Sequence, residues 1–322
     1  MCRCHRSTDQ ARTRTRSRSR RGSPRASSRA IAYTLRVLPY VWLSLSIVWL
    51  WLPPQTSERV SLSRVAVSAT WLALAIGHGY ATGVVTPLGV LIILAFGLLC
   101  YRYSQELQGI TTIAVTLFSL GLMAHVIPGF SNLLVVRDDV LTPSAVPYML
   151  FLNFDKAQIG LFLLAFGPPL LSSQTDWATM LRTALPGVLL LIAVLMACAL
   201  LFGHVRFDFK WPQIFPVWAW SNLLFTCTAE EALFRGVIQR RLQGGSVWSE
   251  PSDKGIAGLV IAAIAFGAAH YAGGVWSMVL AAIAGVGYGW MFWRTNRIEA
   301  SILAHFLVNT THILCFTYPA RV

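Results

Sequence analysis

Long apolar runs recur along nearly the whole chain. The runs are 37–52, 65–81, 84–103, 110–127, 157–172, 184–203, 214–235, 256–271, 275–293 and 300–317. Most approach the roughly 20 residues that an α-helix needs to cross the hydrocarbon core of a bilayer. The pattern predicts an all-α protein, a polytopic integral membrane helical bundle with about eight to ten transmembrane helices.

Composition supports a membrane protein over a water-soluble one. The chain has 322 residues, of which 55% are hydrophobic and 12% charged, whereas soluble domains carry about 25% charged residues. Tryptophans gather at the ends of the runs, as in an aromatic belt at the membrane interface. They include Trp42, Trp49, Trp51, Trp211, Trp218, Trp220 and Trp293.

Four stretches of different character divide the chain. Residues 1–30 are rich in Arg and Ser and lack an apolar pattern, so we expect a disordered tail. Residues 31–127 form an N-terminal transmembrane block, and 128–156 form a polar linker with several prolines. Residues 157–322 form the second transmembrane block. The tail's charge suits anionic lipid headgroups or, less well, nucleic acid, but a solvated tail is the simpler interpretation, and we expect no nucleic-acid partner.

The basic residues give conflicting signals on orientation. Without the tail and Arg36, one set of alternating loops holds ten Lys and Arg and the other holds five. The positive-inside rule places the side with ten in the cytoplasm. If all ten runs span the membrane, however, this orientation places the Arg-rich tail outside the cell, and the tail then violates the same rule.

Three ionisable residues lie inside the run 214–235 or at its end: Glu230, Glu231 and Arg235. A charge in the middle of a membrane costs roughly 2.5–3.5 kcal/mol on the insertion scale, so such residues usually mark a functional site. The alternative is that the helix ends near Ala229 and the charges lie among headgroups. If the helix continues, Glu231 and Arg235 are four residues apart and pair. Glu230 is turned by about 100° and keeps a free carboxylate, suited to taking a proton.

Two later runs add polar residues at one-turn spacing. Phe266 and His270 are four residues apart, as are His305 and Asn309. A lone histidine in an apolar helix usually bonds a neighbouring helix, which is how we interpret His78 and His125. Three runs that each contribute such residues nevertheless indicate a shared site.

Glu230-Glu231-x-x-x-Arg235, Phe266-x-x-x-His270 and His305-x-x-x-Asn309 together resemble the signature of the CPBP family. These are CAAX-processing and bacteriocin-processing intramembrane proteases, related to Rce1-type enzymes. The resemblance covers roughly 150–318, and "LNFDKAQIGLFLLAFGPPLL" at 152–171 is similar to bacterial members. It implies an intramembrane endopeptidase acting on a protein or peptide substrate at the bilayer, in the bacterial inner (plasma) membrane.

The resemblance also implies a role for each motif residue. Glu230 would activate the attacking water with help from His270. His305 and Asn309 would stabilise the oxyanion. Glu231 and Arg235 would orient and support the site.

The residues themselves do not decide whether the site uses a metal ion. Glu231, His270 and His305 would make a two-histidine, one-carboxylate zinc site with water as fourth ligand. The chain has no HExxH motif that would argue for zinc, and a carboxylate already paired with Arg235 is a poorer ligand. We therefore favour a metal-free, glutamate-driven mechanism.

Other functions and motifs remain to be weighed. A transporter would use buried acids and histidines as a proton relay, and a non-catalytic scaffold or immunity factor would share the protease fold. Gly285-x-x-x-Gly289 predicts close helix packing rather than a nucleotide loop. The six cysteines are scattered and indicate no disulfide framework.

Overall fold

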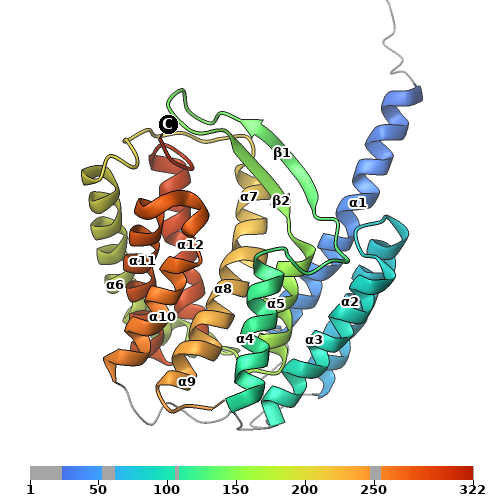
Figure 1. Cartoon of the computed structure of the whole chain (residues 1–322), viewed down its shortest axis with the longest axis horizontal. Coiled ribbons are helices and arrows are strands. Elements are labelled where there is room, and N and C mark those ends of the chain that lie inside the picture. The colour runs from blue at the N-terminus through green and yellow to red at the C-terminus, as the bar shows by residue number, and fades with distance from the viewer. Residues whose placement is uncertain (1–23, 53–61, 106–108, 247–254, 322) are drawn as a thin grey trace, which may run out of the picture.

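The computed structural model describes residues 24–52, 62–105, 109–246 and 255–321, and this part of the chain is a bundle of helices with one small sheet (Figure 1). The helices are α1 (Pro24–Trp49), α2 (Leu62–Ala81), α3 (Pro87–Gln105), α4 (Gly109–Met123), α5 (Phe154–Ala165), α6 (Gln174–Leu201), α7 (Phe215–Ser221), α8 (Thr228–Leu233), α9 (Arg240–Leu242), α10 (Ile256–Ala268), α11 (Gly274–Thr295) and α12 (Ile298–Cys315). Each predicted apolar run corresponds to one helix or, for 214–235, to the continuous helix α7–α9. The predicted helical bundle is therefore confirmed.

The helices have the length and surface of membrane spans. Among the described residues, α3, α6, α11 and α12 are long and apolar enough to cross a membrane, and shorter apolar helices of 10–17 residues lie in α1, α2, α4 and α10. Leucines such as Leu94 and Leu189 are about 60% exposed. Exposed apolar side chains on successive helix turns suit lipid rather than water. The chain is an integral membrane protein, although fewer helices span by length alone than the eight to ten that the sequence predicts.

The N-terminal helix begins earlier than expected. Helix α1 starts at Pro24, inside the stretch 1–30 for which we predicted disorder. Proline suits a first helical turn because its missing N–H needs no partner there. Residues 1–23, which hold most of the predicted tail, lie outside the described residues.

The stretch 128–156 is more than a polar linker. It contains β1 (Leu133–Asp139) and β2 (Tyr148–Leu152), which pair antiparallel, and α5 begins before it ends. The hairpin lies across the upper end of the bundle in Figure 1. Its Leu150 packs with Trp218 of α7 and Ile313 of α12. This contact attaches the hairpin to the two helices that carry much of the site.

Small residues and buried polar groups hold neighbouring helices together. Gly285 of α11 lies so close to Ala263 of α10 that an added Cβ would sit 3.0 Å from the Ala263 Cα, which confirms the predicted close packing at this glycine. At the N-terminal end, Trp42 of α1 donates to His78 of α2 at 2.6 Å. His78 therefore bonds a neighbouring helix, as predicted.

Helix α7–α9 changes its winding on both sides of the two glutamates. The π-helical turns η1 (Asn222–Cys227) and η2 (Phe234–Gln239) enclose the α-helical segment α8. Where η1 meets α8, the Thr228 hydroxyl donates to the carbonyl of Leu223, five residues earlier, at 2.8 Å. Such π-helical insertions are rare and often occur at functional sites.

Candidate active site

Glu230, Glu231 and Arg235 lie in the middle of a continuous helix that runs on to Leu242, so the helix does not end near Ala229. Glu230 is 6% exposed, and Glu231 and Arg235 are fully buried. Each buried charge therefore needs a partner of opposite sign.

Glu231 and Arg235 form the predicted pair. Arg235 Nε lies 3.1 Å from Glu231 Oε2, and Arg235 Nη2 donates to the carbonyl of Gly285 at 3.2 Å. The guanidinium also lies 5.0 Å from the Phe266 ring centre and 5.8 Å from that of Tyr288. Arg235 thus holds Glu231 in place and ties the continuous helix α7–α9 to α10 and α11.

His305 of α12 lies between the two glutamates. Its Nδ1 is 2.9 Å from Glu231 Oε1, and its Nε2 is 3.9 Å from Glu230 Oε2. An ionised carboxylate only accepts, so Nδ1 donates to Glu231 and Nε2 faces Glu230. The ring stacks on Tyr288 with centres 4.6 Å apart. Glu231 and Tyr288 together fix the orientation of this imidazole.

Glu230 is not the free carboxylate that its helical position predicted. Lys156 Nζ lies 2.6 Å from Glu230 Oε1, and both side chains are nearly buried. The prediction was wrong because it considered only partners on the same helix, whereas Lys156 comes from α5, 74 residues away in sequence. The only sign in the sequence was a lysine directly before the apolar run 157–172.

The residue before Lys156 anchors the start of α5. Asp155 Oδ2 lies 2.8 Å from His125 Nδ1, and Asn132 donates to Asp155 Oδ1 at 2.9 Å. His125 therefore bonds a neighbouring helix, as predicted, from the loop after α4. These contacts fix the position from which Lys156 reaches Glu230.

His270 lies in the turn after α10, next to Phe266. Its Nδ1 donates to the carbonyl of Phe266 at 2.8 Å, which leaves Nε2 for another partner. The Phe266 ring contacts both histidines, with centres 4.7 Å from His270 and 5.6 Å from His305. Phe266 thus spaces the two imidazoles.

Asn309 belongs to a second polar cluster, one helical turn beyond His305. Its side-chain nitrogen donates to Asn222 Oδ1 at 3.2 Å, and the Cys227 thiol donates to the same oxygen at 3.3 Å. Asn222 was not predicted from the sequence, since an asparagine in a helix has many ordinary uses. Asn309 Nδ2 also donates to the Cys227 sulfur at 3.8 Å, a weak acceptor that a stronger one can replace.

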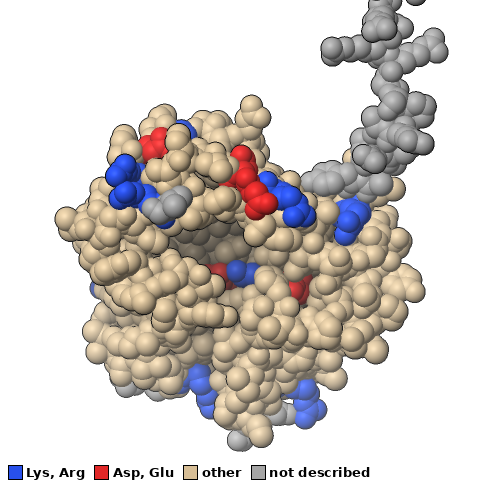
Figure 2. All heavy atoms as spheres, turned by 45° about the horizontal axis from the view of Figure 1, so that its top comes forward, with Lys and Arg blue, Asp and Glu red and all other residues tan. Residues whose placement is uncertain are grey.

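A hollow opens on the face of the molecule shown in Figure 2, and acidic and basic side chains lie at its floor, surrounded by residues of other types. The charged residues of the site are two acids of α8, Glu230 and Glu231, and two permanent cations, Lys156 of α5 and Arg235 of η2. Their charges balance, so a further positive charge on His305 would make the cluster cationic.

The residues proposed for zinc are not arranged as a ligand set. Both oxygens of Glu231 are engaged, one by His305 and one by Arg235. Within the described part of the chain, no group of three His, Cys, Asp or Glu side chains is placed to hold a metal ion. The geometry therefore does not fit the zinc site of Glu231, His270 and His305.

Comparison with known proteins identifies the segment that carries these side chains. Residues 211–311 match the model of one family, described as type II CAAX prenyl endopeptidase Rce1-like. No curated protein and no solved structure matches the chain. The matched segment contains all six predicted site residues but not Lys156, which lies outside it. Residues 211–311 are thus similar to the Rce1-like family of type II CAAX prenyl endopeptidases.

Proposed function

We propose that the chain is an intramembrane endopeptidase that hydrolyses a peptide bond of a protein or peptide substrate with a water activated by Glu230. Such processing is of the CAAX type or related to it. Because residues 152–171 resemble bacterial members of the family, we place the protein in a bacterial inner membrane. The family match supports the reaction class, and the geometry around Glu230 supports the mechanism.

The observation that carries the mechanism is the different environment of the two Glu230 oxygens. Oε1 is held by Lys156, whereas Oε2 has no hydrogen-bond partner among the described residues, although it is buried. His305 Nε2 lies 3.9 Å from that oxygen. A water beside both atoms would be within hydrogen-bond reach of each. Lys156 would keep Glu230 ionised, as a general base must be.

The reaction then follows from these positions. The water oxygen attacks the scissile carbonyl carbon while its proton passes to Glu230 Oε2. The carbonyl oxygen becomes an oxyanion, to which His305 Nε2 donates together with an N–H of Asn309 that turns from the weakly accepting Cys227 sulfur. His305 must carry a second proton for this role, which makes the cluster cationic and complements the negative charge of the oxyanion. Glu230 returns its proton to the leaving amine as the C–N bond breaks.

The test is Glu230→Gln, which keeps the size of the side chain and removes its basicity. We expect cleavage of a fluorogenic peptide in detergent to fall by about 10²–10⁴-fold, the contribution typical of a general base. Asp176→Asn is the matched control, because it removes an exposed carboxylate at the start of α6 and should leave turnover unchanged. Turnover near wild type in a folded Glu230→Gln protein would refute the general-base role.

The same assay separates the metal-free mechanism from a zinc mechanism. Chelators should leave the wild type active, and elemental analysis of active enzyme should find no stoichiometric zinc. Stoichiometric zinc that falls in His270→Ala and His305→Ala would overturn the metal-free mechanism, while the endopeptidase assignment would survive.

A further inference from the structure

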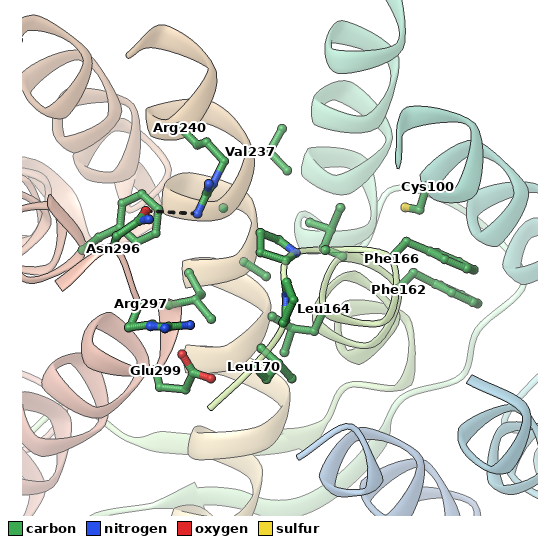
Figure 3. A pocket seen from close by; sticks show the side chains of 18 of the residues that line it. Cys100, Phe162, Leu164, Phe166, Leu170, Val237, Arg240, Asn296, Arg297 and Glu299 are labelled. Carbon is green, nitrogen blue, oxygen red and sulfur yellow. Dashed lines mark hydrogen bonds between the residues drawn. The ribbon is translucent and has the colours of Figure 1, made fainter. Parts of the chain in front are cut away.

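A second cavity of about 420 Å³ lies away from the glutamates, near the start of α12 (Figure 3). Its walls come from α5 and the loop that follows it, from the end of helix α7–α9, and from the junction of α11 and α12. None of the six predicted site residues lines it. The cavity is therefore separate from the site that contains Glu230.

One side of the cavity is cationic. Figure 3 shows the guanidinium groups of Arg240 and Arg297 pointing into it from neighbouring elements. Arg240 is 5% exposed, lies 5.2 Å from the Phe292 ring centre and donates to Asn296 Oδ1 at 3.4 Å. These contacts fix the direction of its guanidinium. Arg297 is exposed, and its guanidinium has no hydrogen bond or ion pair among the described residues.

The acidic residue in the wall does not cancel this charge. Glu299 is almost fully buried, and its Oε1 accepts from the backbone N–H of Leu171 at 2.7 Å and from the Trp51 indole at 3.1 Å. These donors direct one oxygen of the carboxylate into the protein. With two arginines and one glutamate, the cavity keeps a net charge of +1.

The other side of the cavity is apolar. Phe162 of α5 stacks on Phe166, which directly follows the helix, with the ring planes 3° from parallel. Cys100 of α3 lies beside these two rings in Figure 3. A cationic wall facing an aromatic wall matches an amphiphile with an anionic head. Guanidinium groups bind phosphate oxygens in bidentate fashion, and basic pockets between transmembrane helices bind anionic lipid headgroups.

We propose that this cavity binds an anionic phospholipid, with its phosphate on Arg240 and Arg297 and the first part of an acyl chain against Phe162 and Phe166. The volume lies within the 300–1,000 Å³ typical of small-molecule sites and accommodates a headgroup with the start of a chain. Trp51 at the same end is suited to the membrane interface, where such headgroups lie. The inference does not depend on peptidase activity.

The test uses the full chain, purified in mild detergent and delipidated, with lipid binding measured by native mass spectrometry and thermal unfolding. Phosphatidylglycerol should bind and raise the unfolding temperature. Diacylglycerol, which lacks the phosphate, and inorganic phosphate, which lacks the chains, should do neither. Phosphatidylcholine should bind at least about tenfold more weakly, because its headgroup carries no net negative charge.

Arg297→Gln should weaken phosphatidylglycerol binding by about tenfold or more, as expected for loss of a hydrogen bond to a charged group. Arg294→Gln is the matched control, because this exposed arginine lies near the same end of α11 but outside the cavity. Equal loss in both variants would show general surface attraction and overturn the proposal. Equal binding of phosphatidylcholine, or displacement of the lipid by millimolar phosphate, would overturn it as well.

Discussion

The proposed hydrolysis depends most on the ion pair between Lys156 and Glu230. A carboxylate in a membrane helix is costly when it stands alone, and the Glu230 carboxylate is nearly buried. Lys156 supplies the opposite charge at 2.6 Å and fixes one oxygen. The other oxygen is thereby left in a defined position for water. In the proposed mechanism Lys156 is thus a positioning residue that acts through Glu230.

Replacing Lys156 by Met should lower both stability and turnover. The substitution leaves the Glu230 charge buried without its partner, which costs roughly 3–5 kcal/mol, and it frees the carboxylate to rotate. Lys156→Arg, which keeps the charge, should retain more of both properties. The measurements are thermal unfolding and peptide cleavage in detergent.

A double variant provides the control for this pair. Adding Glu230→Gln to Lys156→Met removes the stranded charge, so the double variant should recover most of the lost stability while it stays inactive. Additive losses of stability in the two single variants would mean that the pair contributes nothing and that its short distance is incidental.

Sequence reasoning at this scale succeeds for contacts within one helix. The Glu231–Arg235 pair follows from their four-residue spacing alone, because helix geometry fixes which side chains share a face. Lys156 and Asn222 meet Glu230 and Asn309 only through the packing of different helices. No spacing rule encodes such contacts.

The apolar pattern of the sequence predicted neither the π-helical turns nor the β-hairpin. The pattern marks where helices run, but η1 and η2 change only the hydrogen-bond spacing inside one apolar run. The hairpin strands β1 and β2 are short and lie in a stretch with prolines and charges. The strands lack the alternation of apolar and polar residues that would mark them, and their packing against α7 and α12 selects the extended conformation.

The close contact of α10 and α11 at Gly285 holds the carbonyl that accepts a hydrogen bond from Arg235. A larger side chain at Gly285 should therefore have a strong effect. A Cβ there would meet Ala263 at 3.0 Å, so Gly285→Val should force the helices apart and cost roughly 1–3 kcal/mol. The shift also moves the Gly285 carbonyl away from Arg235, which should reduce turnover. Thermal unfolding and peptide cleavage measure the two effects.

Gly77→Val in α2 is the matched control for this prediction. A Cβ at Gly77 would have no neighbour within 4 Å, so the same substitution meets no second helix there. We expect stability and turnover close to wild type. Equal losses at both positions would point to helix propensity rather than to the contact between α10 and α11.

For the whole molecule, the structure simplifies the question of orientation. Helix α1 begins at the same end of the bundle at which α12 ends (Figure 1). The two termini should therefore lie on one side of the membrane, which agrees with the even number of apolar runs in the sequence. Lys156 and Arg235 are buried in the site and do not act as loop charges. Without these two residues, one set of loops holds nine Lys and Arg residues instead of ten, and the other set holds four instead of five.

This corrected charge balance predicts the orientation of the molecule. The side with nine basic residues includes Arg240, Arg241 and Arg297 and should face the cytoplasm. Both termini should then lie outside, although the N-terminal tail carries ten arginines. Compartment-specific reporters at the C-terminus of the full chain and of a chain starting at residue 24 test this. Both should report the outside, because the body's charges are spread over several loops. A cytoplasmic reporter in the full chain alone would show that the tail sets the orientation, and a cytoplasmic reporter in both chains would contradict the charge argument.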